Sequence, residues 1–234
     1  MNNYKSLLYS CINSLDYSHT YSQSHGIYNN ILKFVSVNFI LGMTMLLGAF
    51  IINYKTNDCI VRTILTFLLI TFWTYIVHIA MHIYKENPIG KMHDIHHNSL
   101  YKNELSADIF EVLINIILIG GVIWIPFMMV LEKYSGYRLI NHYIILVWAL
   151  VFTTYHLVNY HQLNDEVHKQ HHKEDGTKNY GPEWYDILFN TKAEHSNIED
   201  MNSGIINMAL TTLGVLSLKD TSYDIVKIIR NRIY

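Results

Sequence analysis

The residues most able to do chemistry in this sequence are its histidines. There are 14 among 234 residues, nearly as many as the 17 Lys and Arg residues together. Ten of them fall into four groups: an HxxxH pair (His78, His82), two HxxHH boxes (His93, His96, His97 and His168, His171, His172) and a looser pair (His156, His161). On a helix, positions i, i+3 and i+4 share one face, so each box would present its imidazoles together. Imidazole suits Fe, Zn and Cu, and eight or more converging rings exceed what one metal accepts. The spacing predicts a site for two metal ions.

The remaining histidines are weaker candidates. His19, His25 and His142 stand alone, and a lone histidine is more often a surface residue or a satisfied polar one than a ligand. His195 lies outside the boxes and is either a further ligand or a surface residue.

His156 and His161 are five residues apart, which on a straight helix puts them about 140° apart around the axis. Both can bind the same site only if the helix ends or bends between them. His156 is therefore the safer assignment, and His161 is retained because it lies two helical turns before His168.

Four windows without Asp, Glu, Lys or Arg are the elements that must position these histidines. Each contains 19 or 20 residues: Phe34–Ile52, Thr63–Met81, Val112–Leu131 and Leu139–Val158. A helix of about 20 residues crosses a hydrocarbon core of about 30 Å, so each is long enough to span a membrane. A fifth apolar stretch, Gly204–Leu218, has only 15 residues and favours an interfacial or re-entrant helix. Pro126 lies inside the third window and predicts a kink there.

The charges predict the arrangement of these spans. Residues 1–30 form a polar lead-in, and residues 31–234 form a single membrane domain. Short turns near 53–62 and 132–138 predict two helical hairpins. This topology puts 13 of the 17 Lys and Arg on the side of the N-terminus, residues 82–111 and everything after 159. The positive-inside bias makes that side cytosolic. The predicted fold is therefore all-α and integral to the membrane, with four transmembrane helices in two hairpins and a cytosolic, histidine-rich helical cap.

Composition excludes other classes of protein. Only 15% of the residues are charged, against about 25% in a typical soluble domain. The net charge of −2 provides no positive field that would attract nucleic acid. Two cysteines, Cys11 and Cys59, cannot form a disulfide scaffold.

The order of the boxes resembles the fatty acid hydroxylase superfamily of membrane di-iron enzymes. The similarity covers about residues 74–195 and continues past the last box. There, residues 179–181 (Asn-Tyr-Gly) and 184–191 (Trp-Tyr-Asp-Ile-Leu-Phe-Asn-Thr) are similar to the family's Asn-Tyr-Gly and Trp-Asp-x-Leu-Phe-Gly-Thr segment. Two departures stand out. Asn190 replaces the usual glycine, and the His-Pro-x-Glu of many sterol enzymes is absent, although Glu111 stands in a similar place.

The resemblance implies two iron ions, O₂ as cosubstrate and oxidation of an unactivated C–H bond in a lipid. The predicted metal ligands are His78, His82, His93, His96, His97, His156, His161, His168, His171, His172 and His195. The missing sterol-type segment favours hydroxylation of a fatty acyl or related lipid, with sterol desaturation or methyl oxidation as the alternative. In a eukaryotic host the expected location is the endoplasmic reticulum.

The sequence contains no Gly-x-Gly-x-x-Gly turn for a flavin or nicotinamide cofactor. Electrons are therefore expected from a separate protein, which the resemblance implies to be cytochrome b5 and its reductase, or an equivalent. Two other classes of protein also combine apolar helices with clustered histidines. A metal transporter should place ionisable residues at mid-membrane, where these windows have none. A scaffold with structural zinc needs at most four ligands per metal, which leaves the second box unexplained.

Overall fold

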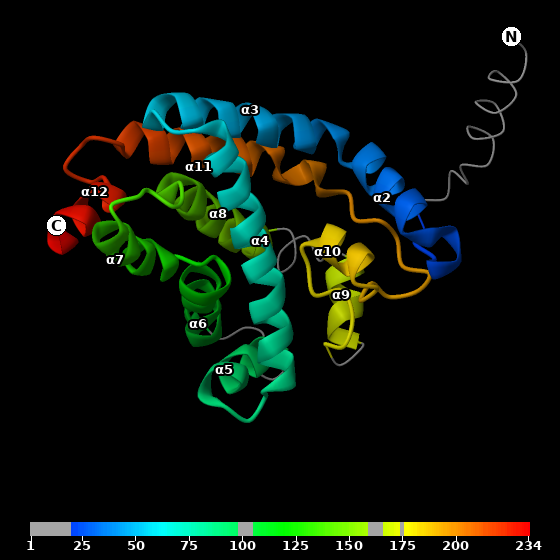
Figure 1. The fold of residues 1–234 in the computed structure, drawn as a ribbon. Coiled ribbons are helices and arrows are strands. Elements are labelled where there is room, and N and C mark those ends of the chain that lie inside the picture. Colours follow the sequence, from blue (N-terminus) through cyan, green and yellow to red (C-terminus); the bar gives the residue numbers. More distant parts are fainter. Residues whose placement is uncertain (1–19, 98–104, 159–165, 174–175) are drawn as a thin grey trace, which may run out of the picture.

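The computed structural model describes residues 20–97, 105–158, 166–173 and 176–234 (Figure 1). These residues are mainly helical and contain no strand, only an isolated bridge between Thr20 and Asn197. The prediction of an all-α fold is confirmed for this part of the chain. Four helices are long and apolar enough to cross a membrane: Phe39–Thr56, Ile60–Ile83, Ile109–Ser135 and Met201–Leu218.

The first long helices lie near the surface of the bundle. Helix α2 (Gly26–Val37) leads into α3 (Phe39–Thr56), which ends where Asn57 adopts a left-handed backbone conformation with φ of 49°. Helix α4 (Ile60–Ile83) then crosses α3 and runs to the other end of the molecule (Figure 1). Large apolar side chains on α3, including Phe39, Leu47 and Phe50, are exposed. Such a surface fits contact with lipid.

The third apolar window is interrupted, but not at Pro126. Helix α6 (Leu105–Ile114) continues as a π-helical segment, η3 (Asn115–Ile119), and α7 (Trp124–Ser135) begins after a break. Gly121 in that break has φ of 76°, and a Cβ atom on Gly120 would lie 2.7 Å from Ala149. The chain therefore bends where glycines allow close packing. Pro126 is the third residue of α7, where a missing N–H costs no helical hydrogen bond.

Helix α8 (His142–Tyr155) occupies most of the predicted span over Leu139–Val158 and runs from the end of the bundle near α12 to the histidines, but it is slightly shorter than predicted and buried. The apolar helix there covers only His142–Val158, and 11 of the 14 residues of α8 are buried. Trp148, Ile145 and their neighbours form the main hydrophobic core with side chains of α4, α7 and α11. This window is apolar because it packs against protein on every side.

The fifth apolar stretch is longer than predicted. A 3₁₀ turn, η5 (Met201–Gly204), continues into α11 (Ile205–Leu218), and together they form a helical stretch of 18 residues that is apolar on average. By length and composition this stretch could cross a membrane, which the 15-residue window did not predict, and the expectation of an interfacial or re-entrant helix stays a prediction. It lies alongside α3 and α8 (Figure 1).

The C-terminal helix α12 (Ile225–Ile233) lies at the end of the bundle where α7 ends and α8 begins (Figure 1). The Tyr234 hydroxyl donates to the Met129 carbonyl at 3.3 Å, and the Tyr143 hydroxyl donates to Asp224 at 2.8 Å. The histidine-bearing end of α4 is at the opposite end. The expectation that everything after residue 159 shares the histidine side is therefore wrong.

This placement changes the distribution of positive charge. Eight of the 17 Lys and Arg residues belong to the end opposite the histidines: Lys55, Arg62, Lys133, Arg138, Lys219, Lys227, Arg230 and Arg232. The excess of positive charge on the histidine side disappears. The positive-inside bias therefore no longer supports the cytosolic orientation, which stays a prediction.

Candidate metal centre

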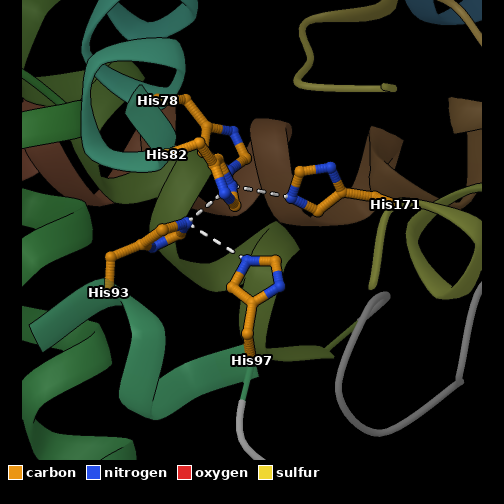
Figure 2. Close-up of side chains that lie close together, drawn as sticks. All are labelled: His78, His82, His93, His97 and His171. Carbon is orange, nitrogen blue, oxygen red and sulfur yellow. Dashed lines mark hydrogen bonds between the residues drawn. The ribbon is translucent and has the colours of Figure 1, made fainter. Parts of the chain in front are cut away.

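Five predicted ligands converge at the end of α4. His78 and His82 lie one turn apart on α4, His93 and His97 lie one turn apart on α5 (Pro88–His97), and His171 comes from α9 (Glu166–Lys173) (Figure 2). One ring nitrogen from each lies within 4.8 Å of all the others. We call these five residues the first histidine group.

The nitrogen spacing in the first group suits metal ligation. The Nε2 atom of His82 lies 3.2 Å from that of His171 and 3.1 Å from that of His93. The Nε2 atoms of His93 and His97 are 3.2 Å apart. Ligands about 2.1 Å from a metal and at right angles to one another are separated by about 3 Å. The nitrogens therefore already have the spacing of neighbouring ligands.

Two of these rings are oriented by backbone carbonyls. His78 Nδ1 lies 2.5 Å from the Tyr180 carbonyl oxygen, and His171 Nδ1 lies 2.6 Å from that of Lys178. A carbonyl can only accept, so each Nδ1 carries the proton and each neutral ring points its Nε2 lone pair into the group. Nε2 of His78 is buried and has no hydrogen-bond partner among the described residues. Such an orphaned acceptor costs about 1–3 kcal/mol, and a metal ion would satisfy it. The residues present fit a metal.

Gly176 allows the loop after α9 to approach the first group. Its φ is 68°, and a Cβ atom placed there would lie 2.1 Å from Cε1 of His82. Only a glycine avoids both the backbone strain and the collision with the ring. Spacing in the sequence carries no signal for this role.

A second histidine group lies beside the first and consists of His156, His168 and His172. The Nε2 atoms of His168 and His172 are 2.9 Å apart, and the rings of His156 and His168 have centroids 4.8 Å apart. The rings of His97 and His172 stack at 4.2 Å and join the two groups. Glu111 is not among the predicted ligands, but it lies beside the second group, with its Oε1 3.0 Å from His156 Nε2.

His156 lies where α8 widens into a π-helical turn over residues 156–158. Such turns occur often at functional sites. The α-helix gives way to this π-helical turn at His156, and the residues that join the turn to His161 lie outside the described part of the chain. His161 itself, and the side chain of His96, lie outside the described residues.

The structure does not bring His195 to either group. Its side chain is 81% exposed, its Nδ1 lies 4.0 Å from Glu194, and its backbone N–H donates to the Tyr21 carbonyl. Eight of the eleven predicted ligands therefore lie together in the described structure.

The segment after the last box fixes the position of a backbone carbonyl that contacts His78. Asp186, which begins the last turn of α10 (Glu183–Leu188), is buried and accepts hydrogen bonds from the backbone of Tyr180 at 3.0 Å and Gly181 at 2.6 Å. The Thr191 hydroxyl donates to the same carboxylate at 2.6 Å. Burial raises the pKa of Asp186 to about 6, although these donors oppose that shift. The carboxylate thus holds the peptide whose carbonyl orients His78.

Asn190 explains one departure from the expected motif. Its φ is 58°, in the left-handed region that glycine adopts freely and that asparagine tolerates better than most residues. The replacement of glycine is therefore compatible with the local backbone.

Comparison with known proteins agrees with this geometry. Residues 63–191 match the model of the fatty acid hydroxylase family, a group of iron-using enzymes. The match covers more than half of the chain and all eight converging histidines. No curated protein and no solved structure matches the chain. On the extent of the family match, the chain belongs to the fatty acid hydroxylase family.

Proposed function

We propose that this protein is a membrane di-iron oxygenase that hydroxylates an unactivated C–H bond of a fatty acyl or related lipid. Family membership indicates a lipid-oxidising oxidoreductase. The observation that carries the finer proposal is the convergence of eight histidines in two adjoining groups. Eight nitrogens exceed the needs of one metal, and a redox-inert zinc ion could not activate oxygen.

The two histidine groups would each hold one iron ion. Bound iron supplies the redox chemistry that activates O₂. The chain's own part is to fix the ligand nitrogens, through the carbonyls of Tyr180 and Lys178, and to keep water away from the buried rings of His78 and His171. In the overall reaction one oxygen atom enters the C–H bond and the other leaves as water. Two electrons and two protons come from outside the substrate.

An apolar cavity next to the site supports a lipid substrate. It has a volume of about 540 Å³, lies between α3, α4, α8 and α11, and is lined almost wholly by apolar side chains. A second cavity of about 60 Å³ adjoins it and is bounded by His78, His156 and His168. Leu41, Trp148 and other residues line both cavities. A lipid chain in the large cavity would thus lead to the histidines.

The chain is a multi-pass membrane protein by its apolar helices and its family. We further propose that the histidine end faces the cytosol. In a eukaryotic host the protein would lie in the membrane of the endoplasmic reticulum. Electrons would come from a separate donor there, such as cytochrome b5 with its reductase. Purified protein supplied with lipid, O₂ and NAD(P)H alone is then expected to be inactive, and the donor pair should restore turnover.

The deciding experiment expresses the protein in a host that lacks such lipid oxidation and supplies ¹⁸O₂. Two irons per chain and a lipid carrying one labelled hydroxyl are expected, with His168→Ala as the inactive control. A labelled or desaturated sterol instead would favour the sterol enzymes of the same family. Metal movement into vesicles without any lipid product would favour a transporter.

A further inference from the structure

The small cavity beside the histidines has a second wall of a different character. Besides His78, His156 and His168, it is lined by four buried ionisable residues from the segment after the last box, which we call the polar wall: Glu183, Asp186, Lys192 and Glu199. The large apolar cavity has no ionisable residue among its described lining. Polar groups and candidate metal ligands therefore line the same small cavity, which adjoins the large apolar cavity.

The centre of this polar wall is an ion pair. Lys192 Nζ lies 2.5 Å from Glu183 Oε1, and the two side chains are 0% and 3% exposed. Glu183 also accepts a hydrogen bond from the backbone N–H of Glu199 at 3.0 Å. A buried ion pair contributes little stability over an apolar pair of similar size, because desolvation offsets the attraction. Because the pair lines a cavity, a role in binding a ligand explains it better than a role in stabilising the fold.

The polar wall carries more negative than positive charge. Three carboxyl groups and one ammonium group line the cavity, so in their ionised forms they would repel an incoming carboxylate or phosphate, with little water to screen the charges. A hydroxyl or amide N–H would instead meet carboxylate oxygens, which have about four acceptor positions each. The wall therefore favours an uncharged donor.

We propose, on the basis of the proposed function, that the small cavity binds the uncharged, hydrogen-bond-donating polar end of a lipid whose chain occupies the large cavity. Because the same small cavity borders the histidines, the oxidised C–H lies within a few bonds of that polar end. Oxidation at mid-chain or at the chain terminus is not expected.

Binding can be tested without metal and without turnover. Trp148 and Trp184 line both cavities, so a lipid brominated at mid-chain should quench their fluorescence. The metal-free protein, with Trp73 and Trp124 replaced by Phe, is placed in uncharged detergent at alkaline pH. Brominated octadecanol should bind about tenfold or more tightly than brominated octadecanoate, as expected for a charge brought against like charge.

Two variants test the role of the wall. Glu183→Gln and Glu199→Gln each remove one carboxylate, and each should reduce the preference for the alcohol severalfold. Glu199→Gln keeps the Glu183–Lys192 pair, so it serves if Glu183→Gln does not fold. Glu194→Gln makes the same change on an exposed side chain outside both cavities and should leave the preference unchanged. Equal affinity for alcohol and carboxylate in the unmodified protein would overturn the proposal, as would an unchanged preference in both cavity variants.

The position of oxidation provides an independent measurement. A hydroxyl within a few carbons of the polar end supports the inference, and one at mid-chain refutes it while the oxygenase function stands. If no oxygenated lipid forms, the proposed function fails, and the binding preference alone decides what the cavity recognises.

Discussion

Gly176→Ala should empty the first histidine group without unfolding the protein. The added Cβ would lie 2.1 Å from Cε1 of His82, whereas ordinary contacts begin at 3.4 Å. The ring or the loop must therefore move by the difference of about 1.3 Å. Such a shift disrupts the spacings of 3.1 and 3.2 Å that His82 makes with His93 and His171. Disturbing the surroundings of a metal ligand typically costs about 10- to 100-fold in metal affinity.

The same substitution also has a backbone cost, which a second glycine isolates. Gly176 has φ of 68°, and a left-handed conformation costs a residue with a side chain about 1–2 kcal/mol. Gly136, which follows α7 at the other end of the bundle, has φ of 73° and nothing within 4 Å of a Cβ atom. Gly136→Ala should therefore lose a similar free energy of unfolding and keep all of its iron.

The assay is the iron content of the purified variants by mass spectrometry, with thermal unfolding of each measured in parallel. Gly176→Ala should lose iron and lipid product, and Gly136→Ala should lose neither. If both variants retain the iron content of the unmodified protein, the argument that the loop at Gly176 positions His82 is wrong.

Three further predictions concern the histidines, Asp224 at the start of α12, and the position of α12 in the membrane. His171→Ala should abolish lipid oxidation and lower the iron content, whereas His195→Ala should leave both unchanged. If the two variants have the same iron content and form the same amount of product, the assignment of His171 and not His195 as a metal ligand is wrong. Burial raises the pKa of Asp224, but hydrogen bonds from backbone N–H groups and a tyrosine hydroxyl outweigh it, so its pKa lies below 3.8. Asp224 therefore contributes stability above that pH and loses it as the pH falls through the folded pKa. The melting temperature of Asp224→Asn should be lower than that of the parent at neutral pH and converge with it in acid; a constant difference would contradict this. Finally, single cysteines at Lys91 and Tyr223, in a background with both Cys11→Ser and Cys59→Ser, should react with an impermeant reagent from opposite sides of sealed vesicles, and labelling from the same side would refute the position of α12.

The spacing of the histidines predicted the eight rings that the described structure brings together. The HxxxH and HxxHH patterns are local, and a helix converts a separation of three or four residues into one shared face. The pairs His78 with His82 and His93 with His97 behave in this way. The four uncharged windows likewise predicted apolar helices, because an uncharged run of about 20 residues has few other stable forms.

Contacts between distant segments could not be predicted in this way. Glu111 reaches His156 across 45 residues, and the Tyr180 carbonyl reaches His78 across 102. Gly176 acts through the backbone, and no residue type or spacing marks such a role. Asp186 lies in the segment that resembles the family, but the sequence did not show that its carboxylate holds the backbone of Tyr180 and Gly181. They became visible only when the folded chain brought them beside the histidines.

The sequence by itself determined that apolar helices carry clustered histidines at their ends. Only the tertiary structure decided how deeply each of those helices is buried in the protein. Leu139–Val158 and Gly204–Leu218 are both apolar, yet α8 packs inside the protein and α11 lies in a helix long enough to cross a membrane. Hydropathy cannot separate the two cases, because a protein core and a bilayer both exclude water and select the same side chains. Because α8 runs from the far end of the bundle to the histidines, α11 carries the chain back to the far end, and the positive charges of α12 lie there.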